Sequence, residues 1–210
     1  MKPSMLVLLK VFVWAACLAP LLWLAWCAIT NTLGPDPTAT ITFTTGLVTI
    51  RLLAISLAMT PIRRLLPRLS WIIKFRRLVG LFAFFYASLH LMTWVALYTG
   101  FDLHAMASDV VKRRYITVGM AAWLLLLPLA ATSTNWAIRK LGGKRWNRLH
   151  KLVYIAALCG VIHYWWQVKP GVLTPVTITV VIALLLLARP ILAYTSRRRS
   201  SASAAGAASL

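Results

Sequence analysis

Long apolar segments alternate with short polar connections along the whole chain. Six of these segments approach the roughly 20 apolar residues that a helix needs to cross a bilayer. They cover residues 6–29, 44–59, 78–98, 115–131, 149–168 and 172–188. The second segment is short and closes at Pro61, although it extends further if the flanking arginines reach the membrane surface. The pattern predicts an all-α integral membrane protein built as a bundle of six transmembrane helices.

The composition supports this class of protein. Apolar side chains make up 60% of the 210 residues and charged side chains 12%, whereas soluble domains are roughly 45–50% apolar and about 25% charged. The six segments use more than half of the chain, so no second soluble domain is expected. We therefore predict one domain over residues 6–195, a short N-terminus over residues 1–5, and a disordered tail, rich in serine and alanine, over residues 196–210.

The basic residues predict how the chain is oriented in the membrane. The 23 Lys and Arg side chains outnumber three carboxylates, which gives a net charge of +20. Such a charge can indicate nucleic-acid binding, but here the basic residues cluster at the ends of apolar segments, as membrane orientation requires. Eighteen fall on one side and four on the other, the latter being Lys112, Arg113, Arg114 and Lys169, while Arg51 lies inside the second segment. Both termini are therefore predicted to be cytoplasmic.

The scarcity of acidic residues excludes several mechanisms. The carboxylates are Asp36, Asp102 and Asp109, there is no Glu, and all three lie in polar connections on the predicted outer side. Catalysis by paired carboxylates, proton transport through a buried acid and a zinc motif that requires Glu are therefore unsupported. The three cysteines lie inside apolar segments, where we interpret them as small buried hydrophobic residues.

The histidines are the residues best suited to carry chemistry. His90, His150 and His163 lie in predicted helices, whereas His104 lies in an outer loop because Gly100 ends the third helix before it. Ionisable side chains inside a membrane are costly and usually serve a function. We therefore predict that the three helical histidines hold a cofactor or a metal, and we assign no role to His104.

Depth in the membrane favours heme as the cofactor. A zinc site needs Cys or carboxylate ligands close to His, but the cysteines and the three Asp residues lie away from the helical histidines. Heme needs only two axial imidazoles from facing helices. His90 lies 13 residues after Arg77, and His163 lies 15 residues after Arg148. At ~1.5 Å per residue both lie about 20 Å from the inner surface. We therefore predict one heme between His90 and His163, toward the outer side.

His150 indicates a second site nearer the cytoplasm. It precedes His163 by 13 residues, which places it about 20 Å lower on a straight helix. A second heme there needs a partner on the third helix, where the matching positions are Arg76 and Arg77 rather than histidines. An arginine is a poor metal ligand but can hold a heme propionate. A flavin or a quinone at this level is the rival interpretation.

Two further expectations concern this inner level. Thirteen residues rotate a side chain about 140° around a helix, so His150 and His163 share a face only if the helix tightens, for example around Gly160. Heme propionates and flavin phosphates also require cations. The candidates for these contacts are Arg51, Arg76 and Arg148.

Several motifs together resemble the ferric-reductase-like transmembrane domain. They are RRLVGL at 76–81 followed by SLH at 88–90, LGPDP at 33–37, TG at 45–46, ATST at 131–134, GKRWNRLHKLVY at 143–154 and IHYWWQVK at 162–169. Within that family they are most similar to the heme-binding membrane subunits of periplasmic methionine sulfoxide reductase systems. The resemblance covers about residues 6–195.

This resemblance implies a six-helix bundle in the bacterial inner membrane that binds heme b, in one or two copies, and FMN. It implies that electrons pass from the quinone pool, or from a cytosolic flavin reductase, to a periplasmic molybdopterin-dependent catalytic subunit in a heterodimer. That subunit reduces methionine sulfoxide and so repairs oxidised periplasmic proteins. By the same resemblance His90, His150 and His163 are heme-associated, whereas His104 has no counterpart.

Other functions remain open from the residues alone. The chain ends about 15 residues after the last predicted helix and has no glycine-rich dinucleotide fingerprint, so we expect an electron-transfer subunit that does not bind NADPH in that way. One alternative is a standalone heme metalloreductase or quinone-linked cytochrome. Another is a small transporter or scaffold without a cofactor, in which the histidines form hydrogen bonds between helices.

Overall fold

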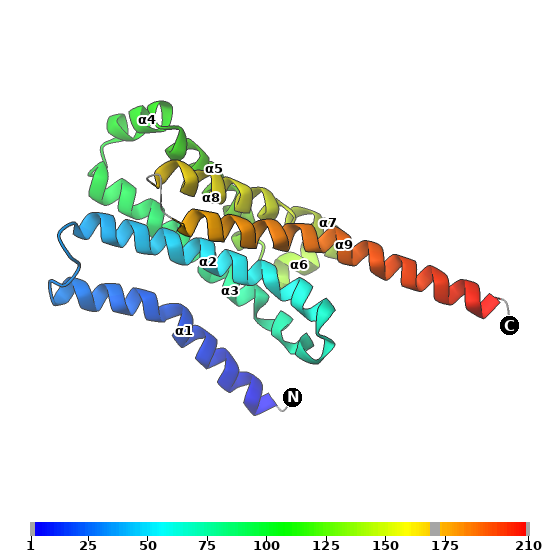
Figure 1. Ribbon diagram of the computed structural model, residues 1–210. Helices are drawn as coiled ribbons and strands as arrows, with labels where there is room; N and C mark the ends of the chain where they lie inside the picture. Colours follow the sequence, from blue (N-terminus) through cyan, green and yellow to red (C-terminus); the bar gives the residue numbers. More distant parts are fainter. Residues whose placement is uncertain (1–2, 169–172, 209–210) are drawn as a thin grey trace.

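The computed structural model describes residues 3–168 and 173–208, and the elements within them are helices (Figure 1). In chain order they are α1 (Pro3–Ile29), α2 (Pro37–Leu65), η1 (Pro67–Phe75), α3 (Arg76–Thr93), η2 (Trp94–Tyr98), α4 (Leu103–Lys112), α5 (Arg114–Ala131), α6 (Asn135–Leu141), α7 (Gly143–Leu149), α8 (Leu152–Gln167) and α9 (Thr174–Ala208). Lys169 and residues 1, 2, 172, 209 and 210, which enter the predictions above, lie outside the described residues.

Five stretches of the described chain are long and apolar enough to cross a membrane, so this is a membrane protein of several passes. They are Ser4–Ile29, Pro37–Leu65, Pro67–Tyr98, Arg114–Ala131 and Thr174–Leu192. The remaining predicted segment, residues 149–168, corresponds to α8, which is apolar but only 16 residues long. α8 packs along α5 as closely as α2 packs along α3.

The two ends of the bundle differ in charge. Figure 1 shows η1, α6 and α7 at one end of the bundle and α4 at the other. We call the first the basic end, because Arg and Lys residues are concentrated in η1, α6, α7 and the turns beside them. The opposite, α4 end holds all three carboxylates: Asp36 caps α2, Asp102 caps α4, and Asp109 lies within α4. Helix N-termini favour such acidic caps.

Small residues allow the central helices to approach closely. Ala83 of α3 and Ala157 of α8 are fully buried, and with Leu57 of α2 and Ile182 of α9 they belong to one apolar core. In a bilayer, helix association depends on such close packing rather than on the exclusion of water. The core therefore fixes the relative positions of α2, α3, α5, α8 and α9.

A proline and a buried tyrosine together shape α1. Pro20 lies inside α1 and disturbs its backbone hydrogen bonds, and α1 bends along its length (Figure 1). The Tyr86 hydroxyl of α3 enters the helix there: it accepts from the Leu21 N–H at 3.1 Å and donates to the Cys17 carbonyl at 2.7 Å. It replaces the bond that Cys17 and Leu21 would otherwise form with each other. Unsatisfied backbone groups are costly in lipid, so this contact fixes α1 against α3.

Of the two expectations for the second segment, the structure shows the extension past Pro61 and not closure at Pro61. α2 runs through Pro61 to Leu65. Pro61 has no N–H for the carbonyl of Leu57 four residues earlier, and the Arg189 Nη2 of α9 donates to that carbonyl at 2.8 Å instead. A neighbouring helix, α9, thus supplies the missing donor. The sequence of α2 alone does not predict this contact.

α9 extends to Ala208, and its last part is rich in alanine, the strongest helix former. The division of the chain into residues 1–5, 6–195 and 196–210, with a disordered tail, stays a prediction.

Replacing Tyr86 by Phe tests the bridge to α1. The Tyr86→Phe change leaves the Leu21 N–H and the Cys17 carbonyl without their partner in a buried position, which costs about 1–3 kcal/mol. We expect a lower unfolding midpoint in an SDS titration from mixed micelles. The control is Tyr98→Phe, because Tyr98 is 53% exposed. Equal midpoints for the two variants would show that the bridge does not stabilise the fold.

Candidate functional site

The structure brings the rings of His90 and His163 close together, edge to face. His90 lies in the last turn of α3 and His163 in the second half of α8, and their ring centroids are 5.8 Å apart with the ring planes at 82°. Each ring is anchored by a backbone carbonyl. His90 Nδ1 lies 2.9 Å from the carbonyl of Thr42 in α2, and His163 Nδ1 lies 2.7 Å from the carbonyl of Tyr115 in α5. Four helices therefore determine where the two rings lie.

These hydrogen bonds determine the protonation of the rings. A carbonyl oxygen only accepts hydrogen bonds, so the Nδ1 atoms of both His90 and His163 must carry the proton and donate. The lone pair of each ring is then on Nε2. This tautomer, with Nδ1–H bound to a backbone carbonyl, is the usual arrangement of a histidine that binds a metal through Nε2.

Glycines make room for both rings. A Cβ atom on Gly46 of α2 would lie 3.0 Å from His90 Cε1, and one on Gly119 of α5 would lie 2.7 Å from His163 Nδ1. Any other residue at these positions would displace the rings, which explains why each helix contains a glycine despite its cost to helix stability. Sequence reasoning noted Gly46 only as part of a motif and missed Gly119.

The donor set of this pair fits a heme better than a zinc ion. Among the described residues, no three His, Cys, Asp or Glu side chains gather closely enough to hold a metal ion, and a structural zinc site takes four protein ligands. A heme iron already has four porphyrin nitrogens and takes only axial ligands from the protein. Metal–imidazole bonds are about 2 Å long, so the 5.8 Å between the ring centroids has the right order for one iron between two Nε2 atoms.

His150 lies nearer the basic end, but not on the helix that carries His163. It is the C-cap of α7, and the chain turns at Lys151 before α8 begins. The prediction that His150 belongs to the same helix as His163 is therefore wrong, and no tightening around Gly160 is needed. The physical reason is that α7 ends at this point, with the His150 N–H bonded to the carbonyl of Trp146.

The His150 ring has one engaged and one unengaged nitrogen. It stacks on Trp146 with a centroid distance of 3.7 Å, and its Nδ1 lies 3.1 Å from the Trp146 carbonyl. Its Nε2 is buried and has no hydrogen-bond partner among the described residues. The backbone of Leu129 also lies near this ring, so His150 is a candidate ligand-binding residue rather than an established one.

Two cavities meet at His150. The apolar cavity, of about 260 Å³, lies between α2, α3 and α5, and Phe84 and Leu126 are among its lining residues. The polar cavity, of about 240 Å³, is lined by Arg76, Trp146, Asn147, His150, Lys151 and Tyr154. Arg76, Trp146 and His150 line both cavities. We refer to the two cavities together as the inner pocket.

Of the arginines predicted near a cofactor, two reach the inner pocket. Arg76 lines both cavities, and Arg77 lines the apolar one while its Nη1 donates to Asn135 Oδ1 at 2.7 Å. Arg51, in the middle of α2, and Arg148, on α7, are exposed and line neither cavity. The structure therefore supports the predicted grouping of His150 with Arg76 and Arg77, but it does not bring Arg51 or Arg148 to the inner pocket.

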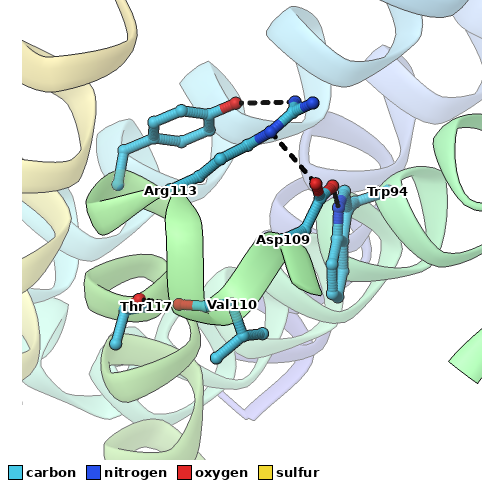
Figure 2. A network of polar contacts seen from close by, with 6 residues as sticks. Trp94, Asp109, Val110, Arg113 and Thr117 are labelled. Atoms are coloured by element: carbon cyan, nitrogen blue, oxygen red, sulfur yellow. Dashed lines mark hydrogen bonds and ion pairs between the residues drawn. The ribbon is translucent and has the colours of Figure 1, made fainter. Parts of the chain in front are cut away.

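A polar network braces the α4 end beside the histidine pair. Figure 2 shows Asp109 of α4 accepting from Trp94 Nε1 at 3.2 Å and pairing with Arg113 Nε at 3.0 Å. Arg113 Nη1 also donates to the hydroxyl of Tyr115, the residue whose carbonyl holds His163. These contacts, with Tyr115 first, raise the pKa of Arg113. Arg113 is one of the four basic residues on the predicted outer side. Its charge there is balanced by Asp109.

His104 takes no part in these arrangements. It lies in the first turn of α4, where Asp102 accepts from its backbone N–H, and its side chain is exposed. This agrees with the sequence analysis, which places His104 outside the transmembrane helices.

Comparison with known proteins places this geometry in a family. Residues 45–161 match the family model described as "Ferric reductase like transmembrane component". The match contains Gly46, His90, Gly119 and His150, and it ends two residues before His163.

Curated relatives match nearly the whole chain. A protein of Herminiimonas arsenicoxydans is 45% identical over 203 residues, which cover 96% of this chain and 93% of that relative. A protein of Rhodospirillum rubrum is 46% identical over 193 residues, 92% of each chain, and one of Ralstonia nicotianae is 44% identical over 80% of this chain and 76% of its own. All three are named protein-methionine-sulfoxide reductase heme-binding subunit MsrQ. The chain therefore belongs to the ferric reductase like transmembrane family, within the group of MsrQ proteins.

Proposed function

We propose that this protein is a membrane electron-transfer subunit that holds a heme b between His90 and His163. The observation that carries the proposal is the pair of facing imidazoles, each with Nδ1 bonded to a backbone carbonyl and each lying over a glycine. The names of the relatives, which describe heme-binding subunits, support the same cofactor. Hydrogen bonding between helices alone would not require the two rings to lie only 5.8 Å apart.

The protein's own groups determine how such a heme behaves. When bound, heme supplies one-electron chemistry at its iron. His90 and His163 would hold the heme, and a heme held by two imidazoles would favour electron transfer over the binding of oxygen. The carbonyls of Thr42 and Tyr115 hold the rings in place and increase the basicity of their Nε2 atoms. The surrounding helices keep water away from the site.

The inner pocket is a second cofactor site in this proposal. His150 presents an unpartnered Nε2 to the pocket, and Arg76 and Arg77 place positive charge beside it. His150 and Arg77 would hold a second heme b here, or these groups would bind an FMN. In either case the second cofactor lies on the route from the basic end to the His90–His163 pair.

The charge asymmetry gives the orientation of the protein in the membrane, and the proposed donor and acceptor then give the direction of electron flow. By the positive-inside rule the basic end faces the cytoplasm and the α4 end the periplasm, in the inner membrane of a bacterium. Electrons enter at the basic end from the quinone pool or a cytosolic flavin reductase. They leave at the α4 end to a molybdopterin-dependent methionine sulfoxide reductase, the catalytic subunit of a heterodimer that repairs oxidised periplasmic proteins. The relatives are named heme-binding subunits of a protein-methionine-sulfoxide reductase, which supports a catalytic partner of that activity.

A second candidate function is a standalone heme metalloreductase. The description of the family model, a ferric reductase, favours it. Purification of the protein from membranes distinguishes the two functions. A soluble catalytic subunit that co-purifies at equal amounts supports the electron-transfer subunit, whereas reduction of ferric chelates by the isolated protein supports the metalloreductase.

Replacing either facing histidine tests the heme site. We expect His90→Ala and His163→Ala each to lose most of the heme that the wild type binds at this site, because one axial ligand is removed. The measurement is the pyridine hemochrome content per chain together with the reduced-minus-oxidised spectrum. His104→Ala is the matched control, because His104 is exposed on α4, and it should retain all of the heme. Full heme content in both test variants would refute the axial assignment.

The glycines provide a second, independent test. A methyl group at Gly119 meets the His163 ring at 2.7 Å, and one at Gly46 meets the His90 ring at 3.0 Å. Overpacking of this kind costs about 1–3 kcal/mol, or roughly 5- to 150-fold in heme affinity. We expect Gly119→Ala to release heme faster than Gly46→Ala in a transfer assay to apomyoglobin. Gly143→Ala is the control, since its Cβ meets nothing within 4 Å; release rates that match this control would contradict the packing argument.

A further inference from the structure

Arg189 of α9 is held in place at the basic end by three contacts. Its Nη1 donates to the Tyr154 hydroxyl at 2.5 Å, its guanidinium lies 4.8 Å from the centroid of the Tyr154 ring, and its Nη2 donates to the Leu57 carbonyl. That carbonyl is available because Pro61 has no N–H. Arg189 Nε is buried and has no hydrogen-bond partner among the described residues. The side chain is therefore fixed in orientation but incompletely satisfied.

A second arginine lies close to the same tyrosine. Arg76 of α3 lines the polar cavity together with Tyr154, and the charges of Arg76 and Arg189 are close enough to repel each other. Lys151 adds a third cation to the wall of this cavity. Like charges gathered in a partly buried place disfavour the fold unless an anion lies among them.

No side chain of this protein can supply that anion. The sequence contains three carboxylates, Asp36, Asp102 and Asp109, and all of them lie at the α4 end. Two of them cap helices, and Asp109 pairs with Arg113. The basic end therefore has two half-buried arginines, Arg76 and Arg189, and the exposed Lys151 without an acidic partner among the side chains. We infer that a bound ligand supplies the compensating anion.

The shape of the inner pocket indicates which ligand this is. The polar cavity that Arg76 and Tyr154 line shares Arg76, Trp146 and His150 with the apolar cavity. A ligand that fills both has an apolar body and one anionic end. We propose that Arg76 and Tyr154 bind the terminal oxyanion of a planar cofactor whose ring lies in the apolar cavity. Arg189, which lines neither cavity, holds the Tyr154 hydroxyl in position and adds positive charge behind it. We call these three residues the arginine site. This proposal rests on the second cofactor site of the proposed function and adds Arg189 and Tyr154 to it.

The oxyanion can be the propionate of a porphyrin or the phosphate of a flavin, and the experiment has one arm for each. The test variant is Arg189→Gln, because glutamine can still donate to the Leu57 carbonyl but carries no charge. Arg139→Gln is the control, since Arg139 is exposed on α6 and its loss changes the net charge equally. Arg189→Lys, which keeps the charge, separates the effect of charge from an effect on folding. All proteins are studied as full chains in nanodiscs of phosphatidylcholine.

The first arm counts hemes per chain by pyridine hemochrome. If the oxyanion is a propionate, Arg189→Gln holds about one heme fewer than Arg139→Gln, while Arg189→Lys stays close to the control. The second arm titrates FMN and riboflavin, which differ by the phosphate, and follows flavin fluorescence. If the oxyanion is a phosphate, the control binds FMN about tenfold more tightly than riboflavin, and Arg189→Gln binds the two equally.

Two outcomes would overturn the inference. One is that Arg189→Gln behaves as Arg139→Gln does in both arms. The other is that Arg189→Gln differs from the control only when phosphatidylglycerol is added to the nanodiscs, which would identify the anion as a lipid headgroup. The heme between His90 and His163 is monitored in the same samples by its low-spin spectrum. If the wild type lacks this heme, the proposed function itself is refuted. If the wild type has this heme but Arg189→Gln behaves as Arg139→Gln does, only the arginine site is refuted.

Discussion

The candidate site depends on one repeated contact, a histidine that donates to a helix carbonyl directly above a glycine. The carbonyl of Thr42 holds His90 and Gly46 follows four residues later, and the carbonyl of Tyr115 holds His163 and Gly119 follows four residues later. Residues four apart lie one above the other on a helix. The missing Cβ thus opens the space through which the ring reaches the carbonyl. The same four-residue relation on α2 and α5 brings two rings from α3 and α8 together.

The two levels of the bundle differ in the charge of the groups that face each other. Near the α4 end, backbone carbonyls engage both histidines, and Asp109 balances Arg113. Near the basic end, Arg76 and Arg189 lie around Tyr154 without a carboxylate. Buried atoms without a hydrogen-bond partner among the described residues occur at both levels, the Tyr164 hydroxyl beside His163 and the Nε2 of His150 among them.

The sequence predicts the class, the helices and the meeting of His90 with His163, because each follows from apolar length and from depth along straight helices. It does not predict features that depend on another helix. The passage of α2 through Pro61 requires Arg189 from α9. The position of His150 depends on where α7 stops, and apolar residues on both sides of that turn conceal it. Gly119 could have been found as a glycine inside an apolar helix, but its purpose requires the ring beside it.

The anchoring of both imidazoles before any cofactor arrives has a consequence for the speed of electron exchange. A redox centre whose ligands move little between its oxidised and reduced forms has a small reorganisation energy, and its electron transfer is correspondingly fast. Backbone carbonyls inside helices are among the least mobile acceptors that a protein has. His90 is fixed to α2 and His163 to α5 through backbone carbonyls rather than through flexible side chains. In the proposed function, this would give a heme held between them a rigid frame for one-electron transfer.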